Sequence, residues 1–267
     1  GYDNQWRNFR WTTNFTYSWN KNEIIELAAN AVNPVTGEAL NLTKLDIKGL
    51  GKAKYILKEG GTLGDLYTTS NLRFNDNGYV EVDKNGNLLM TDEGEDIYLG
   101  SVFPNHNLAW RNDFSYKGIN LGVLFTARLG GVCYSATQAN LDLYGVSEAS
   151  AAARDAGGVL INGREMVDAQ KWYQAIGSQS GLPQYYLYSA TNVRLQELSL
   201  GYTFPRKWFR NKLGLTVSFV GRNLWMIYCK APFDPEAVAS TGLNYQGIDY
   251  FMMPSVRNLG FNVKFQF

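Results

Sequence analysis

Apolar and polar residues alternate with a period of two along several stretches of the chain. From Trp11 to Asn20, every odd position carries an aromatic residue or a threonine, and every even position is polar. Successive side chains of a β-strand point to opposite faces, so this alternation predicts a strand with one apolar face. The same pattern predicts four more strands, over 108–116, 119–129, 213–219 and 259–267.

A further stretch, 193–204, changes its phase in the middle. Its apolar residues stand at odd positions up to Leu195 and at even positions from Leu198 onward. One extra residue shifts all the side chains that follow it to the other face of a strand. A β-bulge near Gln196 and Glu197 would therefore keep both apolar sets on one face, and the stretch predicts a bulged strand.

The connections between these strands are of two kinds. Those at 116–119 and 205–212 are short, whereas 21–104, 131–191 and 226–252 are long, polar and rich in Gly, Asn, Asp and Tyr. Short turns at one end and long loops at the other are typical of the wall of an outer-membrane β-barrel. The predicted strands also approach the 9–11 residues, roughly, that a tilted transmembrane strand needs.

The long connections predict some structure of their own. The first, 21–104, is either one large loop or contains another strand pair near 54–67. In the second, 148–155 and 168–176 are predicted helices, with a turn at Asn162-Gly163 between them.

A soluble β-sandwich would show the same alternation. Three features favour the barrel wall. The face opposite the apolar one carries small or polar residues suited to a wet lumen. Bulky aromatic residues such as Trp19 and Tyr202 stand at strand ends. The last residue, Phe267, continues the row of alternate positions that forms the apolar, outward face of its strand.

Composition excludes several other classes of protein. The 25 Lys and Arg residues nearly balance the 24 Asp and Glu residues, which argues against a basic surface for nucleic acid. No stretch approaches the roughly 18 uninterrupted apolar residues of a membrane-spanning helix. A single histidine and two cysteines exclude the usual zinc sites. The histidine, His106, is expected at the rim of the barrel rather than in a catalytic triad.

The two cysteines are predicted to be free thiols on the outward face. Cys133 extends the strand at 119–129 and Cys229 extends the strand that begins at 213, with 193–204 between them. Two steps of about 4.8 Å between neighbouring strands place their backbones about 9–10 Å apart. A disulfide tolerates Cα separations only up to about 6.8 Å.

Several short motifs occur in a fixed order over almost the whole chain. They are Asn20-Lys21-Asn22-Glu23-Ile24, Asp83-x-Asn85-Gly86 followed by Gly100-Ser101-x-x-Pro104, Phe114-Ser115-Tyr116-Lys117-Gly118, Leu200-Gly201-Tyr202-Thr203-Phe204-Pro205, Gly221-Arg222-Asn223-Leu224 and Asp234-Pro235-Glu236. In order and spacing they resemble the C-terminal part of the SusC/RagA-type TonB-dependent outer-membrane transporters of Bacteroidota.

The resemblance implies an all-β fold, an antiparallel transmembrane outer-membrane β-barrel with long extracellular loops that carry short helices. Residues 1–267 would form the C-terminal segment of one barrel domain of about 22 strands. The plug and the N-terminal strands would lie outside this chain. The implied location is the outer membrane, as a multi-pass β-barrel.

The function that the resemblance implies is TonB-dependent active import of a nutrient, a glycan or an oligopeptide. Its partners would be a SusD-like surface lipoprotein, outer-membrane lipid and, through the missing N-terminal part, the TonB complex. No enzymatic activity, cofactor or nucleic acid is expected. Two alternatives remain open, a small passive outer-membrane pore and a soluble carbohydrate-binding β-sandwich.

The terminal strand is a candidate signal for barrel assembly. It has the pattern polar-x-Gly-x-x-apolar-x-apolar and ends on phenylalanine, which resembles the signal that the assembly machinery reads. An exposed strand edge is a natural template for pairing with another edge. The residues concerned are Asn258, Gly260, Val263, Phe265 and Phe267.

Four charged residues alternate with the apolar residues of their strands and are therefore expected to face the lumen. They are Arg111, Asp113, Arg128 and Arg194. Charges on the lumen side cost little because water is available there. They either line a route for the substrate or pair with residues of the plug, and the sequence favours neither.

One loop crowds oxygen ligands of the kind that calcium prefers, at Asp83, Asn85, Asn87 and Asp92. In an EF-hand loop the glycine stands at position six, whereas Gly86 stands at position four here. The loop is therefore predicted to be a solvated turn, and no metal site is expected.

Overall fold

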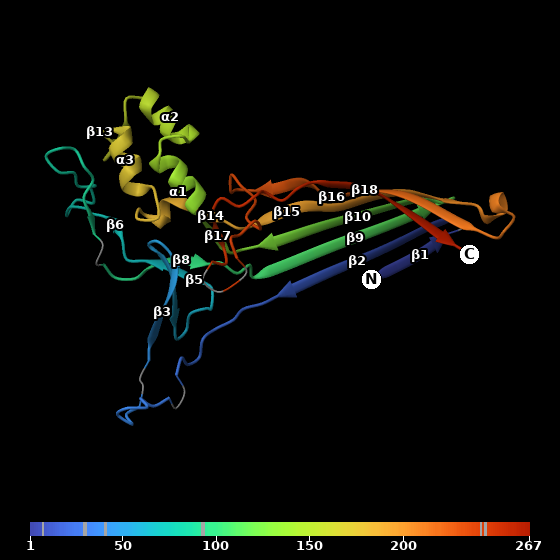
Figure 1. Cartoon of the computed structure of the whole chain (residues 1–267), viewed down its shortest axis with the longest axis horizontal. Coiled ribbons are helices and arrows are strands. Elements are labelled where there is room, and N and C mark those ends of the chain that lie inside the picture. The colour runs from blue at the N-terminus through green and yellow to red at the C-terminus, as the bar shows by residue number, and fades with distance from the viewer. Residues whose placement is uncertain (7, 29–30, 40–41, 92–93, 241, 243–244) are drawn as a thin grey trace.

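Seven strands form one antiparallel sheet, here called the wall, in the computed structural model of the chain (Figure 1). The structure describes residues 1–6, 8–28, 31–39, 42–91, 94–240, 242 and 245–267. In spatial order the wall strands are β1 (Tyr2–Trp6), β2 (Phe9–Trp19), β9 (His106–Tyr116), β10 (Ile119–Leu129), β15 (Asn192–Phe204), β16 (Gly214–Cys229) and β18 (Asn258–Gln266).

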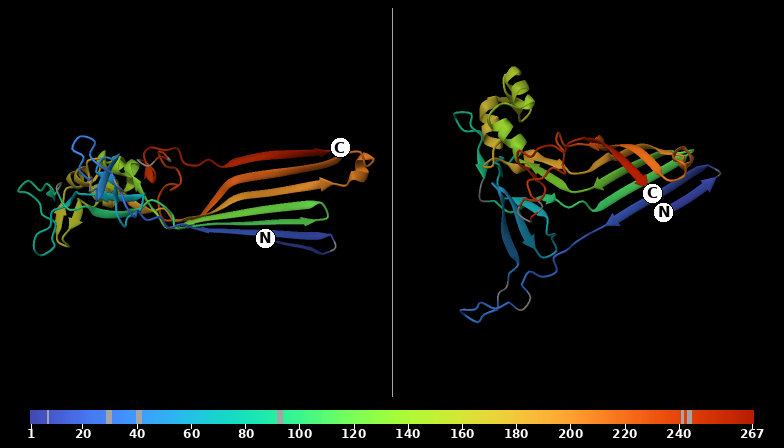
Figure 2. Two further views of the ribbon diagram at one scale, coloured as in Figure 1. Left: turned by 90° about the horizontal axis from the view of Figure 1, so that it is seen from below. Right: turned by 45° about the vertical axis from the view of Figure 1, so that its right-hand side comes forward.

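The sheet is open, with β1 at one edge and β18 at the other. No second sheet lies across either face of it among the described residues (Figure 2). A β-sandwich needs two sheets packed face to face, so the wall does not have that architecture. None of the described helices is both long and apolar enough to cross a bilayer.

The strand register confirms the two faces that the sequence predicts. Along β16, Val217 stands between Tyr202 of β15 and Val263 of β18, whereas Thr216 stands between Thr203 and Lys264. On the apolar face, aromatic rings of neighbouring strands meet, as in the stacked pair Trp11 and Phe114, with ring centroids 6.1 Å apart. The predicted bulge in β15 is also present. Leu124 of β10 pairs with Glu197 and the next residue, Phe125, pairs with Leu195, so Gln196 has no partner residue in β10.

The short turns follow from local backbone chemistry. Between β9 and β10, Lys117 and Gly118 have φ angles of 48° and 91°. Positive φ at both central residues matches the twist of a two-residue hairpin turn. A Cβ on Gly118 would lie 2.7 Å from the carbonyl oxygen of Thr203, so glycine is required there. A 3₁₀ helix, η2 (Arg206–Phe209), connects β15 to β16.

The long connections fold together at one end of the wall into what we call the loop module, residues 20–105, 130–191 and 230–257 (Figure 1). It contains a four-stranded sheet of β3 (Lys44–Leu50), β4 (Ala53–Lys58), β5 (Asp65–Thr68) and β8 (Ile97–Ser101). A second sheet joins β14 (Leu187–Ser189), β11 (Val132–Ser135) and β17 (Ile248–Asp249).

Smaller elements complete the loop module. Two hairpins pair β6 (Asn71–Leu72) with β7 (Met90–Thr91) and β12 (Val159–Ile161) with β13 (Glu165–Val167). The helices are α1 (Ala136–Leu143), α2 (Glu148–Asp155), α3 (Ala169–Ile176) and the 3₁₀ helix η1 (Pro183–Tyr186).

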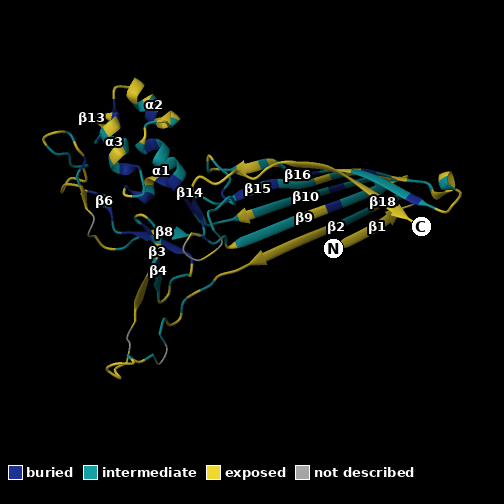
Figure 3. Ribbon diagram, in the orientation of Figure 1, coloured by how far each residue is buried: buried dark blue, intermediate teal, exposed yellow. Residues whose placement is uncertain are grey.

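The hydrophobic core lies in the loop module and not in the wall (Figure 3). Its largest fully buried apolar side chains include Tyr55, Leu66, Leu72, Tyr134 and Ile248. The wall is a single layer whose large apolar side chains are mostly half-buried or exposed, such as Phe261 at 81%. A transmembrane barrel wall has this design, because lipid covers its apolar face.

The structure of the loop module shows which of the elements predicted for the long connections are present. The strand pair near 54–67 exists as β4 and β5, but it belongs to the loop module and not to the wall. Helix α2 spans the predicted residues, and α3 begins one residue late because Asp168 is its N-cap. The predicted turn at Asn162-Gly163 is present, and it joins β12 to β13, a hairpin that the sequence did not predict.

Both cysteines are free, as predicted, but the expected position of Cys133 was wrong. Gly130 and Gly131 have φ angles of 91° and 80°, and there the chain leaves the wall. Cys133 therefore lies in β11, fully buried within the loop module, instead of on the outward face of the wall. Burial raises the pKa of its thiol to about 12, so the thiol stays protonated and unreactive at neutral pH.

Candidate functional site: the inner face of the wall

Ion pairs cross the polar face of the wall from β9 to β16. The guanidinium of Arg111 donates to both oxygens of Asp113, with distances of 2.8 Å from Nε and 3.0 Å from Nη2. Its Nη1 also donates to Glu197 at 3.4 Å, and Arg222 donates from Nε to the other oxygen of Glu197 at 3.0 Å. Charges of opposite sign therefore alternate along these four residues, which we call the inner ion-pair network.

A glycine in β10 makes room for this network. Gly122 stands between Asp113 of β9 and Ser199 of β15. A Cβ at this position would lie 2.9 Å from Oδ1 of Asp113 and 2.5 Å from Oγ of Ser199. Any larger residue would displace these polar groups, so the missing side chain lets charged groups of β9 and β15 meet across β10.

A second cluster of charges joins the wall to the loop module. Arg194 of β15 donates from Nη2 to Asp234 at 2.9 Å and lies 3.1 Å from Glu236. Arg128 of β10 lies 3.5 Å from the other oxygen of Glu236. Asp234 also accepts a hydrogen bond from the hydroxyl of Ser255. These five residues, here called the loop clamp, hold the segment between β16 and β18 against the wall.

The centre of the loop clamp is buried. The side chains of Arg194 and Asp234 are only 4% and 7% exposed. Burial by itself would raise the pKa of Asp234, but the hydrogen bonds from Arg194, Ser255 and the backbone of Glu236 outweigh it and leave the pKa below its ordinary value of 3.8. The carboxylate is therefore ionised at neutral pH and paired with Arg194.

Two pockets of about 410 and 240 Å³ lie where the wall meets the loop module, and Phe103 and Pro104 line both of them. Asn20, Asn105 and Asn107 are among the residues that line the larger pocket. Arg128 and Glu236 of the loop clamp line the smaller one. Their lining supplies hydrogen-bonding groups at the loop end of the inner face.

The structure thus places the four predicted lumen residues in two groups. Arg111 and Asp113 belong to the inner ion-pair network, and Arg128 and Arg194 belong to the loop clamp. Arg194 pairs with Asp234 and Glu236 in a loop of the same chain. The alternation of apolar and polar residues predicts the face on which Arg194 lies but not these partners. The motif Asp234-Pro235-Glu236 was the feature of the sequence that could have indicated carboxylate partners for Arg194. Nothing in the sequence indicates, however, that this motif contacts β15.

The candidate assembly strand lies at an edge of the wall. β18 pairs with β16 on one side, from Asn258 opposite Arg222 to Gln266 opposite Gly214. No described strand pairs with its other side. Val263, Phe265 and Phe267 are 51%, 56% and 98% exposed. The arrangement presents both a free edge and an apolar row, and the signal role of these residues stays a prediction.

The candidate calcium loop is a hydrogen-bonded turn. Oδ1 of Asp83 accepts from the backbone N–H groups of Asn85 and Asn87 at 2.7 and 2.8 Å, and Oδ2 accepts from the side chain of Asn87 at 2.8 Å. These bonds from Asn87 and Asn85 also lower the pKa of Asp83. Asp92 lies outside the described residues. Within the described ranges, no group of three or more His, Cys, Asp or Glu side chains is placed to hold a metal ion.

His106 begins β9 at the loop end of the wall, as expected of a rim residue. Its Nδ1 is 2.8 Å from the hydroxyl of Tyr17, and the two rings stack with centroids 5.9 Å apart. The histidine therefore joins β9 to β2.

The chain is similar in sequence to two TonB-dependent receptors. No family model matches it. It is 25% identical over 97% of its length to TonB-dependent receptor P3 of Formosa agariphila, and 21% identical over 96% to TonB-dependent receptor P39 of the same organism. It spans only 27% and 28% of the lengths of those two relatives.

The fold was compared with solved structures. The chain is similar to solved structures of the RagAB peptide importer, with a TM-score of 0.60 and 18% identity for the 'open-open' state and 0.58 and 20% for the 'closed-closed' state. Each comparison covers 98% of this chain and 27% of the other. The chain is therefore similar in sequence to part of two TonB-dependent receptors and similar in fold to part of the RagAB importer.

The wall has the fold of a stretch of outer-membrane β-barrel, in agreement with the expected location in the outer membrane. The seven described strands form an open arc with β1 and β18 at its two edges. The relatives are named as receptors and importers, in agreement with the expectation that the chain is not an enzyme. Among the described parts of the chain, the inner ion-pair network and the loop clamp occupy the polar face of this arc.

Proposed function

We propose that the chain is the C-terminal wall of a barrel that imports a nutrient across the outer membrane with energy from the TonB complex. The observation that carries the proposal is the division of one open sheet into an apolar outer face and a polar inner face with balanced charges. Such a division suits a wall between lipid and a wet interior.

The edges of the wall support an importer rather than a small passive pore. Bacterial barrels have about eight strands or more, and an open arc of seven leaves two unpaired edges. The strands of this chain therefore need additional strands to close. The proposal places those strands, and the plug that fills their lumen, in the rest of a longer receptor.

The loop module supports a partner on the outer surface. It has its own core and carries exposed apolar side chains, including Phe251 and Met253 at 58% and 79% exposure. We infer that a SusD-like lipoprotein covers part of this module and delivers the substrate to the pockets beside Phe103. The likeness to the RagAB peptide importer supports an oligopeptide as substrate, and a glycan is the alternative.

Uptake by cells that carry the full-length receptor tests the proposal. We expect a strain without the receptor gene to lose growth on one class of nutrient, peptides or glycans, and the wild-type gene to restore it. A receptor unable to engage TonB should fail to restore growth although it reaches the membrane. Import that continues without TonB would contradict active transport and would favour a passive pore.

A further inference from the structure

A basic turn stands at the end of the wall opposite the loop module. Residues 205–212, which include η2, form this turn between β15 and β16 (orange, at the right of Figure 1). Four of its eight residues are cations, and no Asp or Glu occurs between positions 198 and 233. All four cations are exposed, and they are Arg206, Lys207, Arg210 and Lys212.

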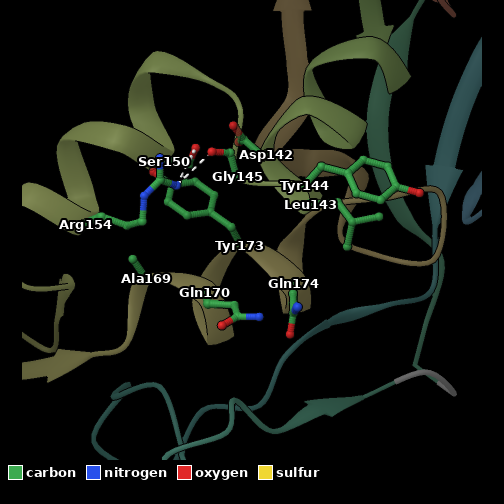
Figure 4. A pocket seen from close by; sticks show the side chains of 10 residues that line it. All are labelled: Asp142, Leu143, Tyr144, Gly145, Ser150, Arg154, Ala169, Gln170, Tyr173 and Gln174. Carbon is green, nitrogen blue, oxygen red and sulfur yellow. Dashed lines mark hydrogen bonds between the residues drawn. The ribbon is translucent and has the colours of Figure 1, made fainter.

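The four cations of the basic turn have no partner within the described ranges, where none of their side chains forms an ion pair or donates a hydrogen bond. Several other cations of the chain are held. Arg154 of the loop module donates from Nη1 to the carbonyl oxygen of Gly145 at 2.8 Å (Figure 4), and Arg111 and Arg222 pair with carboxylates of the wall. Neighbouring charges of one sign repel one another, so the basic turn favours an anion from outside the chain.

Backbone hydrogen bonds hold the basic turn in one conformation. The N–H of Asn211 donates to the carbonyl oxygen of Arg206 at 3.0 Å. The N–H of Lys212 donates to the carbonyl oxygen of Phe209 at 3.1 Å. Arg210 has a φ angle of 53°, in the left-handed region that glycine adopts more readily than arginine. The geometry of the turn therefore does not explain why an arginine stands at position 210.

Aromatic rings connect the basic turn to the apolar face of the wall. Phe204 stands in the outward row, opposite Leu215 of β16. Its ring meets the ring of Trp208 with centroids 5.8 Å apart, and Trp208 is 62% exposed. Tryptophan is enriched where a bilayer meets water, because its ring is apolar and its N–H is polar. Trp208 therefore places the basic turn at the level of the lipid headgroups.

The neighbouring turn adds a fifth cation. The N–H of Thr203 donates to the carbonyl oxygen of Gly118 at 2.7 Å, which holds the turn between β9 and β10 beside the end of β15. The ammonium of Lys117 in that turn lies over the ring of Tyr116, 5.2 Å from its centroid. Two adjacent turns thus combine cations with aromatic rings.

The chemistry of this surface fits a phospholipid with a net negative charge. Guanidinium and ammonium groups both donate to phosphate oxygens, and the apolar face beside them suits acyl chains. With the loop module outside the cell, an orientation that rests on the proposed function, the basic turn faces the inner, phospholipid leaflet of the outer membrane. We propose that residues 205–212 bind the phosphate groups of anionic phospholipids in that leaflet.

Native mass spectrometry of the full-length receptor tests this site. The receptor is purified in tetraethylene glycol monooctyl ether, an uncharged detergent. It is titrated with dioleoylphosphatidylglycerol, which is anionic, or with dioleoylphosphatidylethanolamine, which has no net charge. The dissociation constant of the first bound lipid is measured for each, and we expect phosphatidylglycerol to bind at least about fivefold more tightly.

Two variants connect the preference to the basic turn. The turn variant carries Arg206→Gln, Lys207→Gln, Arg210→Gln and Lys212→Gln. Each cation near an anionic lipid surface contributes about fivefold to binding, so this variant should bind phosphatidylglycerol at least about tenfold more weakly. Its affinity for phosphatidylethanolamine should not change.

The control variant loses the same net charge from exposed residues of the loop module. It carries Lys48→Gln, Lys84→Gln, Lys230→Gln and Arg257→Gln. Its affinity for both lipids should equal that of the wild type, because these residues lie at the opposite end of the wall.

Four results would overturn the proposal. Equal binding of the two lipids by the wild type would point to a different anion, such as an acidic protein. The others are an unchanged affinity of the turn variant for phosphatidylglycerol, a loss of its affinity for both lipids, and an equal loss in the control variant. The titration reports lipid binding and not uptake, so its failure is distinct from import without TonB, which would contradict the proposed function.

Discussion

Val217→Arg is expected to destabilise the full-length receptor by about 2–4 kcal/mol, whereas Thr216→Arg, one residue earlier in β16, should cost much less. Val217 lies on the apolar face between Tyr202 and Val263, where an arginine would have to enter lipid. Thr216 lies on the polar face beside Lys264, where water can solvate the added charge. The free energy of unfolding in lipid vesicles, measured by urea titration, gives both values.

The comparison controls for the size and charge of arginine, because both variants receive the same side chain in the same strand. Moderate salt should be present, since Lys264 would otherwise repel the arginine at position 216 and raise its cost. Equal losses of stability in the two variants would contradict the assignment of the two faces.

Arg194→Met should be the most damaging substitution in the loop clamp, with a loss of about 3–5 kcal/mol. It leaves the carboxylate of Asp234 in a site where that side chain is only 7% exposed, and the remaining hydrogen bonds from Ser255 and the backbone of Glu236 cannot replace a guanidinium. Arg128→Met is the matched control. Its side chain is 51% exposed and 3.5 Å from Glu236, so the loss should stay below about 1 kcal/mol. Urea unfolding of the reconstituted receptors measures both.

The loop clamp also has a defined dependence on pH. The pKa of Asp234 is below 3.8 in the folded chain, so its contribution to stability is complete well above that value. The contribution is lost as the pH falls through the lower, folded pKa. In the Arg194→Met, Asp234→Asn double variant the buried charge is gone, and most of the lost stability should return. No recovery in the double variant would show that Arg194 acts by packing and not by pairing with Asp234.

The long strands of the wall could be predicted from the sequence because lipid and water impose opposite demands on alternate residues. Even the bulge at Gln196 was visible, since it reverses the phase of an otherwise regular pattern. Strand β1 was missed because it has five residues and its outward row, Tyr2, Asn4 and Trp6, is interrupted by a polar one.

The loop module could not be predicted in the same way. Its strands have two to seven residues and pack around a core, so their apolar residues do not alternate. The loop clamp could not be predicted from the sequence either, for a related reason. Arg194 and Asp234 are 40 residues apart in the chain, and only the fold of the segment between β16 and β18 brings them together. The alternation of apolar and polar residues predicted the face of the strand on which Arg194 lies, but it could not predict which residue pairs with Arg194.

The most direct test of the account is the accessibility of successive residues of β16 in intact outer membranes. Single cysteines are introduced at positions 215 to 220 of a full-length receptor in which Cys133 and Cys229 are serine, and they are treated with a membrane-impermeant maleimide after mild permeabilisation. We predict that positions 216, 218 and 220 react and that 215, 217 and 219 are protected by lipid. Uniform reaction at all six positions, or protection of the even ones, would contradict a barrel wall with its polar face toward the lumen.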